Sequence, residues 1–147
     1  GLAAACDLCV AATTASFATS EVRFGLIPAT IGPYVLRAIG ARQASRYFLT
    51  AERITARRAW ELGLVHELTE PDALDAKVRE IINALLAGGP QAQTAAKDLI
   101  RAVADRPVDD ALVEDTAQRI AQIRATPEAR EGLSAFLEKR PPNWMES

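Results

Sequence analysis

The sequence predicts an α/β fold in which a mostly helical chain carries the end of a core β-sheet. Two apolar segments, residues 8–12 and 64–68, have the length and composition of short or buried strands. After residue 33, apolar residues recur at helical spacing with few interruptions. Because helical segments outnumber strands, we expect most of this chain to be helix packed beside a sheet.

Composition and charge exclude several classes of partner. The chain has 147 residues, of which 49% are hydrophobic and 24% charged, as is typical of a globular domain. Its formal net charge is -2 with both signs mixed, which predicts no nucleic-acid partner. The apolar residues 1–12 are too few for a membrane span and include Asp7. We therefore expect a soluble, reducing, cytoplasmic setting without membrane contact.

The cysteines and the histidine do not form a predicted metal or disulfide site. Cys6 and Cys9 would point to opposite faces of an extended segment, so a disulfide between them is not expected. His66 is the one histidine, which leaves too few ligands for zinc, and a lone histidine in a strand is more often structural than catalytic. We predict no metal and no redox cofactor.

The first third of the chain is predicted to be a short helix, a strand and a long irregular segment. Residues 2–6 are helix-like and lead into the strand at residues 8–12. Glycine and proline then recur so often that no long helix can cross the next segment: Gly25, Pro28, Gly32 and Pro33. Such loop-rich regions commonly carry functional groups.

The rest of the chain is predicted to be helical apart from the strand at residues 64–68. Helices are expected at residues 34–40 and 42–50, and a third begins at the N-cap Thr55 and stops at Gly63. The next helix carries one apolar stripe, made of Leu74, Val78, Ile81, Ile82 and Leu85. Gly88-Gly89-Pro90 ends that helix, and further helices follow at residues 91–104, 108–124 and 127–138, the last with Thr126 as N-cap. Trp144 lies near an end that we expect to be loose.

Two strands do not make a self-sufficient sheet. A buried strand needs neighbours, because each unpaired buried backbone group costs about 1 to 3 kcal/mol. We therefore expect most of the sheet to be formed by residues upstream of Gly1, and the long helix to need a partner surface for its apolar stripe.

Glu21 is the most conspicuous acid in the loop-rich region. It lies within residues 17–25, among apolar groups and just before the glycine- and proline-rich loop. Apolar surroundings can adapt a carboxylate for proton transfer. The alternative is a solvated carboxylate or one paired with Arg23, and the local pattern alone does not decide between them.

Three ordered motifs resemble the crotonase superfamily of acyl-CoA enzymes and cover the chain in register. They are Ala-Ala-Ala-Cys6-Asp7-Leu-Cys-Val-Ala-Ala, Phe17-x-x-x-Glu21-Val-x-x-Gly25-Leu-Ile-Pro28 and Leu49-Thr-x-x-x-Ile-Thr-Ala-x-x-Ala-x-x-Leu-Gly63-Leu-Val. The tail Glu131-Gly-Leu-Ser-Ala-Phe136-Leu-Glu-Lys139-Arg-Pro-Pro is similar to the family's C-terminal end.

The resemblance implies a fold and an assembly. It implies the crotonase spiral of strand-strand-helix turns, with residues 1–68 as the C-terminal part of the spiral core. Residues 69–147 would be the helical trimerisation region of a homo-oligomer, either a trimer or a hexamer. Members bind an acyl-CoA thioester, so coenzyme A enters as part of the substrate. Two backbone N–H groups stabilise the thioester oxyanion, and both are expected upstream of Gly1.

The resemblance also assigns site residues. Glu21 matches a catalytic glutamate of the family's hydratases. The acyl pocket corresponds to Leu26, Pro28, Ala29 and Thr30, for which a tight turn with core contacts is the structural alternative. Phe136 and Lys139 match tail positions that can contact coenzyme A from a neighbouring subunit, and an amphipathic helix end with a solvated lysine is the alternative.

One position departs from the family's two-glutamate hydratases. The first glutamate aligns with Gly1, which has no side chain to hold a water molecule. The resemblance therefore implies an enzyme with one acid/base, Glu21. The segments at residues 20–40 and 46–53 are most similar to bacterial methylglutaconyl-CoA hydratases, which act in leucine or isoprenoid breakdown.

Three hypotheses for function follow. The first is a lyase that hydrates the C2–C3 double bond of an enoyl-CoA, with 3-methylglutaconyl-CoA as the candidate substrate. The second is a Δ3,Δ2-enoyl-CoA isomerase, which also needs a single carboxylate and differs because its product gains no water. The third is a catalytically incomplete oligomerisation fragment, since a site without the oxyanion donors should not stabilise an enolate.

Overall fold

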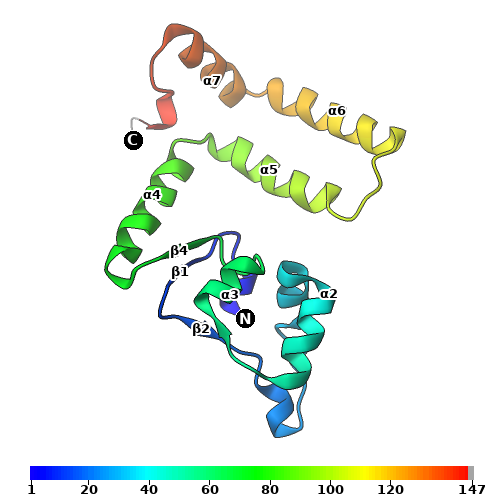
Figure 1. Ribbon diagram of the computed structural model, residues 1–147. Helices are drawn as coiled ribbons and strands as arrows, with labels where there is room; N and C mark the ends of the chain where they lie inside the picture. Colours follow the sequence, from blue (N-terminus) through cyan, green and yellow to red (C-terminus); the bar gives the residue numbers. More distant parts are fainter. Residues whose placement is uncertain (146–147) are drawn as a thin grey trace. The chain divides into compact units, whose positions relative to one another are not determined.

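The computed structural model describes residues 1–145 and divides into two compact units between Glu80 and Ile81 (Figure 1). The first unit contains α1 (Leu2–Ala5), β1 (Val10–Ala12), β2 (Ser16–Phe17), the 3₁₀ turn η1 (Glu21–Phe24), α2 (Gly32–Thr50), β3 (Ile54–Thr55), α3 (Ala56–Glu61), β4 (Glu67–Thr69) and η2 (Pro71–Ala73). Helix α4 (Leu74–Leu86) crosses the division. The second unit adds α5 (Pro90–Val103), α6 (Asp110–Arg124), α7 (Pro127–Glu138) and η3 (Asn143–Met145).

The strands of the first unit form two small ladders. β1 pairs in parallel with β4, with Val10 opposite Glu67, and β2 pairs antiparallel with β3, with Phe17 opposite Ile54. The parallel pair confirms two predicted strands, although the second one was placed too early. Leu64 and Val65 are not strand but a buried turn, since both backbone N–H groups donate to the Ala59 carbonyl.

The strands β2 and β3 were missed by sequence analysis. Each has only two residues in its ladder, so neither displays an alternating pattern. Their pairing joins residues about forty positions apart in the chain, and a local reading of the sequence does not detect it.

Helix α2 was predicted as two helices, and its backbone explains both descriptions. Gly40 has φ 75° and ψ 158°, which breaks the helical geometry at the position where the first predicted helix ends. The helix ends at Thr50, and its C-cap Ala51 has φ 50° and donates its N–H to the Tyr47 carbonyl. The N-cap Thr55 is also confirmed, because its hydroxyl accepts the N–H of Arg58 at 3.2 Å.

The hydrophobic core of the first unit lies between α2, α3 and the strands. Its buried members are Ala11, Val35, Ile39, Ala44, Tyr47, Ile54, Ala59, Leu64 and Val65. Several are alanines, which lets the helices approach the strands closely. This packing fixes α2, and α2 in turn fixes the loop that precedes it.

The helices of the second unit begin and end close to the predicted positions. Asp109 caps α6 by accepting the Leu112 N–H at 2.8 Å, and Thr126 caps α7 by accepting the Ala129 N–H at 3.2 Å. Glu128 of α7 caps α5, since its carboxylate accepts the N–H groups of Gln91 and Ala92 at 3.0 and 2.8 Å. Caps shared between helices therefore hold this unit together.

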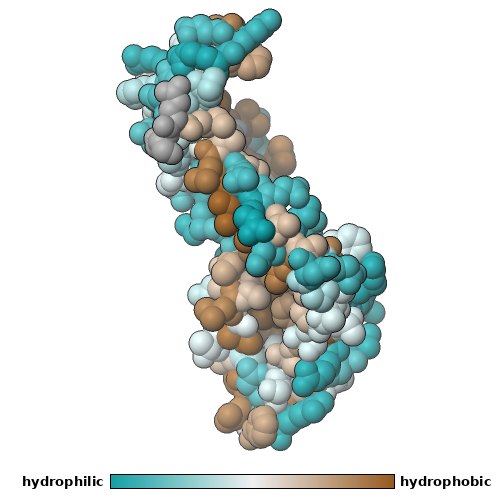
Figure 2. Space-filling model, turned by 90° about the vertical axis from the view of Figure 1, so that its left-hand side faces the viewer, coloured by the Kyte–Doolittle hydropathy of each residue, from teal (hydrophilic) through white to brown (hydrophobic). Residues whose placement is uncertain are grey.

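Many apolar side chains stay at the surface, seen as brown patches in Figure 2. None of the residues of α4 is fully buried, and Val78, Ile82 and Leu85 of its apolar stripe are exposed. Within residues 1–145, the helices are all too short or too polar to cross a membrane.

Candidate active site

Glu21 is the first residue of η1, in a turn that is fixed on both sides. Before it, the buried Thr19 donates its hydroxyl to the Tyr47 carbonyl of α2 at 3.1 Å. After it, Gly25 adopts φ 70° and ends the turn, and the Leu26 N–H donates to the Glu21 carbonyl at 3.1 Å. The position requires glycine, because left-handed backbone is unfavourable for a residue with a Cβ atom. The backbone of Glu21 is thus held by contacts with α2 and by its own turn.

The Glu21 carboxylate has the property expected of a proton-transfer group. Its Oε2 atom is shielded from solvent and has no hydrogen-bond partner among the described residues. A buried carboxylate oxygen without a donor is costly, and a substrate proton or a bound water molecule would satisfy it.

Arg23 does not neutralise Glu21. Its Nη2 atom donates to the Ala51 carbonyl at 2.9 Å, at the C-terminal end of α2. No ion pair between Arg23 and Glu21 is present in residues 1–145. The pairing of Glu21 with Arg23 is therefore not observed, and Arg23 instead holds η1 against α2.

The loop that follows η1 carries several exposed residues. Leu26, Ala29 and Thr30 are exposed, whereas Pro28 is buried. The loop is tightly turned, since the Ala29 N–H donates to the Ile27 carbonyl at 2.8 Å and the Gly32 N–H to the Pro28 carbonyl at 2.7 Å. The tight turn is present, and Leu26 also leaves an apolar side chain exposed. The predicted acyl pocket and its structural alternative therefore do not exclude each other.

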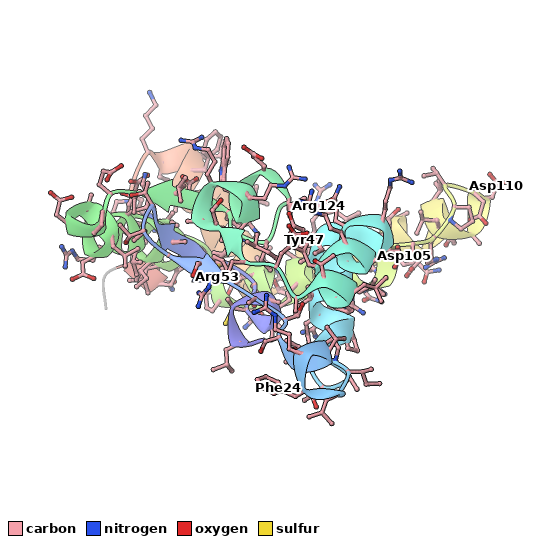
Figure 3. All side chains as sticks on the ribbon, turned by 60° about the horizontal axis from the view of Figure 1, so that its bottom comes forward. Phe24, Tyr47, Arg53, Asp105, Asp110 and Arg124 are labelled. Atoms are coloured by element: carbon pink, nitrogen blue, oxygen red, sulfur yellow. The ribbon has the colours of Figure 1, made fainter. Side chains whose placement is uncertain are left out.

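Sequence analysis missed two apolar residues of η1 and this loop, Phe24 and Ile27. Each side chain is 75% exposed, and Phe24 projects outward from η1 (Figure 3). The sequence signal that could have identified them is an apolar residue in a glycine- and proline-rich loop. The sequence does not show whether such a side chain is exposed.

Gly1 lies against Ile31. A Cβ atom on Gly1 would overlap the Ile31 Cγ2 atom and lie 3.2 Å from Ile31 Cβ. The space into which a side chain of residue 1 would grow is thus filled by an apolar group. A side chain at residue 1 would therefore require the Ile31 side chain to move.

Phe136 and Lys139 lie at the end of α7, in the second unit. Both side chains are exposed, with Phe136 at 79%. Lys139 has φ 53°, the left-handed conformation that favours glycine at a helix end. Glu21 and its loop belong to the first unit, whereas Phe136 and Lys139 belong to the second.

His66 has a structural contact. Its Nδ1 atom accepts the Cys9 N–H at 3.1 Å, and its own N–H donates to the Cys9 carbonyl at 2.8 Å. Both cysteines are free thiols, and burial, followed by the neighbouring Cys6, raises the pKa of Cys9. The described residues contain no group of three or more metal-ligating side chains.

Two hollows are found in the second unit, with volumes of about 410 and 280 Å³. They are lined by Pro90, Gln91, Thr94, Ala95, Asp98, Arg119, Gln122, Ile123 and Thr126. None of the predicted site residues lines either hollow. Among the described residues, the buried side-chain oxygen without a hydrogen-bond partner is Glu21 Oε2, and Glu21 lines neither hollow.

Known structures share this fold. A Legionella pneumophila protein described as an enoyl CoA hydratase/isomerase (crotonase) is 45% identical, with a TM-score of 0.93 over 97% of this chain and 55% of its own. A Shewanella pealeana enoyl-CoA hydratase is 46% identical, with a TM-score of 0.91 over 97% of this chain and 53% of its own. The chain has the crotonase-like α/β fold that the sequence predicted.

The family model for enoyl-CoA hydratase/isomerase matches residues 1–147. The crotonyl-CoA hydratase of Syntrophomonas wolfei is 32% identical over 145 residues, which are 98% of this chain and 55% of that protein. This chain belongs to the enoyl-CoA hydratase/isomerase family. It spans about half the length of the curated relatives that it matches.

Proposed function

We propose that the natural protein containing this chain is an enoyl-CoA hydratase-type lyase with Glu21 as its acid/base. The observation that carries the proposal is the buried Glu21 Oε2 atom without a partner, in a turn held rigidly against α2. Glu21 would activate a water molecule for addition across the C2–C3 double bond and deliver the proton to C2. One carboxylate can serve both steps when it passes on the proton that it takes from water.

The Gly1 position supports a mechanism with one carboxylate. A second glutamate there would have to displace the Ile31 side chain, which packs against the core. Glu21 would therefore both activate the water molecule and deliver the proton to C2. Its neighbours Leu26, Pro28, Ala29 and Thr30 would line the acyl group.

For the substrate we propose 3-methylglutaconyl-CoA, on the resemblance of residues 20–40 and 46–53 to the hydratases of that thioester. Similarity to curated relatives does not select the acyl group. The Escherichia coli relative named 2,3-dehydroadipyl-CoA hydratase is 31% identical over 144 residues, which is close to the value for the crotonyl-CoA enzyme. Assays must therefore compare acyl groups directly.

The alternative activity is Δ3,Δ2-enoyl-CoA isomerisation. The absence of a side chain at Gly1 favours it, because moving a double bond needs a proton carrier but no position for water. A further alternative is that the chain taken alone is a helical oligomerisation fragment without oxyanion donors. The product separates these activities, since hydration adds one water molecule and isomerisation adds none.

The proposal includes an assembly, a cofactor requirement and a location. Exposed apolar side chains on the second unit's helices, among them Val113, Ile120 and Leu133, support a trimer or hexamer of identical chains. Coenzyme A would enter only as part of the substrate, with no other cofactor. A cytoplasmic setting is supported by the free thiols of Cys6 and Cys9.

The test is Glu21→Gln in the natural protein, with Glu67→Gln as the matched control. Glu67 is exposed on β4 in the same unit, so its substitution makes the same chemical change away from the site. Glu21→Gln should lower kcat by about 10² to 10⁴-fold through loss of acid/base catalysis. Activity of the Glu21→Gln variant within a few-fold of the control would contradict the assignment.

A further inference from the structure

The residues two positions before and two positions after Glu21 are bonded to the same helix end. The Thr19 hydroxyl donates to the Tyr47 carbonyl at 3.1 Å. Arg23 Nη2 donates to the Ala51 carbonyl at 2.9 Å. These carbonyls lie one turn apart at the C-terminal end of α2, beside which Figure 1 shows η1. A carbonyl has two lone pairs, so Tyr47 accepts the Thr19 hydroxyl in addition to the Ala51 N–H. Glu21 therefore lies between two anchors.

The two anchors differ in their exposure to water. Thr19 is 5% exposed and is the one buried polar residue within residues 1–145, while Tyr47 and Ala51 are 3% and 2% exposed. A buried hydroxyl that loses its acceptor is costly, because no water molecule replaces the bond. Arg23 is exposed, so water can partly replace its bond. The Thr19 anchor is therefore the stronger constraint on η1.

The end of α2 that accepts these bonds is itself held in place. Arg46 binds both carboxylate oxygens of Glu52, with its Nε and Nη2 atoms at 2.6 and 2.9 Å from them. A two-pronged guanidinium–carboxylate pair fixes orientation as well as distance, and this pair spans the left-handed Ala51. The Tyr47 hydroxyl accepts the Arg58 Nε–H of α3 at 3.3 Å. Both anchors are therefore attached to a fixed part of the first unit.

The position of the Glu21 carboxylate depends on the backbone of η1. Within residues 1–145, no hydrogen bond orients its shielded Oε2 atom. Proton transfer requires the two heavy atoms to come within about 2.6 to 3.2 Å of each other. A misplacement of about 1 Å can lower the rate about 10²-fold. Residues that fix the backbone of η1 therefore influence the chemical step without contacting the substrate.

We propose that Thr19 and Arg23 are positioning residues, which hold the Glu21 carboxylate where it transfers protons. This inference rests on the proposed function of Glu21. Both residues act through the backbone of η1, and neither has to contact the substrate. Loss of either anchor keeps the acid/base but lets η1 move relative to α2. Such a loss should slow the chemical step and leave substrate binding nearly unchanged.

The experiment measures kcat and KM of the natural protein with 3-methylglutaconyl-CoA or crotonyl-CoA, whichever reacts faster. Thr19→Val removes the hydroxyl and keeps the shape of the side chain, whereas Thr19→Ser keeps the hydroxyl. Arg23→Gln removes the guanidinium. The control Ser45→Ala removes a hydroxyl that donates to the Ala41 carbonyl of α2 at 2.9 Å. The control Arg57→Gln removes an exposed arginine of the same unit.

Thr19→Val should lower kcat about tenfold to 10²-fold, the scale expected when an acid/base is displaced by up to about 1 Å. Its KM should stay within about twofold of the wild-type value, because binding is not affected. Thr19→Ser should restore most of the rate. Arg23→Gln should lower kcat less than Thr19→Val, and both controls should match the wild type. Equal losses in Thr19→Ser and Thr19→Val would overturn the inference.

A combination with Glu21→Gln separates positioning from general damage. When two residues act as a unit, their effects on the rate do not add. Adding Thr19→Val or Arg23→Gln to Glu21→Gln should therefore lower the residual rate no further. A full additional loss in the double variants would overturn the inference, because the anchors would then act on something other than Glu21.

Hydrogen exchange tests the anchors independently of activity. The Gly25 N–H donates to the Val22 carbonyl at 3.2 Å, and the Leu26 N–H donates to the Glu21 carbonyl at 3.1 Å. Removal of either anchor should make both N–H groups exchange about threefold faster or more, while exchange in α3 stays at the wild-type level.

Unchanged exchange at Gly25 and Leu26 would overturn the inference, whether or not hydration is detected. A fully active Glu21→Gln variant would instead contradict the proposed function, on which the inference rests. The two failures are thus seen in different variants and different measurements.

Discussion

The two units of this chain differ in how their helices are stabilised. The first unit buries a contiguous set of side chains, including Val35, Tyr47 and Val65. In the second unit, Leu112 and Ala135 are the buried hydrophobic residues among those described, while Leu133, Phe136 and Leu137 are more than half exposed. The first unit is held by internal packing, whereas the second relies on helix caps and ion pairs and leaves apolar surface uncovered.

This difference matches the different roles that we propose for the two units. The carboxylate chemistry needs a rigid frame, and Glu21 is attached through Thr19 and Arg23 to the packed helix α2. The second unit presents an exposed ring and cation at the end of α7, which suits binding of a large substrate or of another subunit. Substitutions of the same kind in the two units should therefore have different consequences.

The largest difference in the free energy of unfolding is expected between Val65→Ala and Val113→Ala. Val65 is 1% exposed and Val113 is 58% exposed, so the same two carbons are removed from the core and from the surface. Val65→Ala should lower the free energy of unfolding by about 2 kcal/mol. Val113→Ala should change it by less than about 0.5 kcal/mol at concentrations where the protein is monomeric. Denaturant unfolding measures both, and equal losses would contradict the comparison.

The contact between Gly1 and Ile31 can be tested with a double-mutant cycle. Gly1→Ala should destabilise the natural protein by about 1 kcal/mol or more, because the new methyl group overlaps the Ile31 side chain. Ile31→Ala should remove that penalty, so the effects of the two substitutions should not add. Additive effects would show that residue 1 has room for a side chain after all.

Removal of an N-cap hydroxyl should lower stability in both units. Thr55→Ala and Thr126→Ala each remove one hydroxyl that accepts a helix N–H at 3.2 Å. Each should cost about 1 kcal/mol of stability. Thr126→Ala should lower the hydrogen-exchange protection of α7 more than that of α3, and Thr55→Ala should do the reverse. Identical protection changes in both helices would indicate that the units do not unfold separately.

The smallest effect is expected from pH. The hydrogen bond from Arg140, followed by that from the Asn143 N–H, lowers the pKa of Glu131 from its ordinary value of 4.5. The stability from this carboxylate is therefore complete above pH 4.5 and is lost as pH falls through the lowered pKa. As pH falls through that window, the Tm of the wild type should decrease more than the Tm of Arg140→Gln. Parallel pH profiles would contradict the pairing.

The sequence predicted the elements whose signals are local. The Thr126 cap, the Gly88-Gly89-Pro90 break and the apolar stripe of α4 each lie within a few turns of chain, and the helices form where expected. The position of β4 was shifted because the apolar pair Leu64 and Val65 resembles a strand, whereas it is a buried turn.

Non-local contacts could not be predicted from the sequence. The pairing of Phe17 with Ile54 and the contact of Gly1 with Ile31 each join distant segments, and neither has a periodic signature. The motif singled out Glu21 as a candidate, but its unpaired buried oxygen and the bond from Arg23 to the Ala51 carbonyl are visible only in the structure. The pairs of Arg140 with Glu131 and Glu138 and the bond from Trp144 to the Ala87 carbonyl were missed, because arginine and tryptophan near a chain end resemble ordinary surface residues.

The most direct test of the central claim follows the enoyl-thioester absorbance of 3-methylglutaconyl-CoA and crotonyl-CoA incubated with the natural protein. We predict that absorbance falls, with a mass gain of one water molecule, and that 3-methylglutaconyl-CoA reacts faster. Appearance of enoyl absorbance from a Δ3-enoyl-CoA without mass gain, together with no hydration of either thioester, would contradict the hydratase and identify an isomerase.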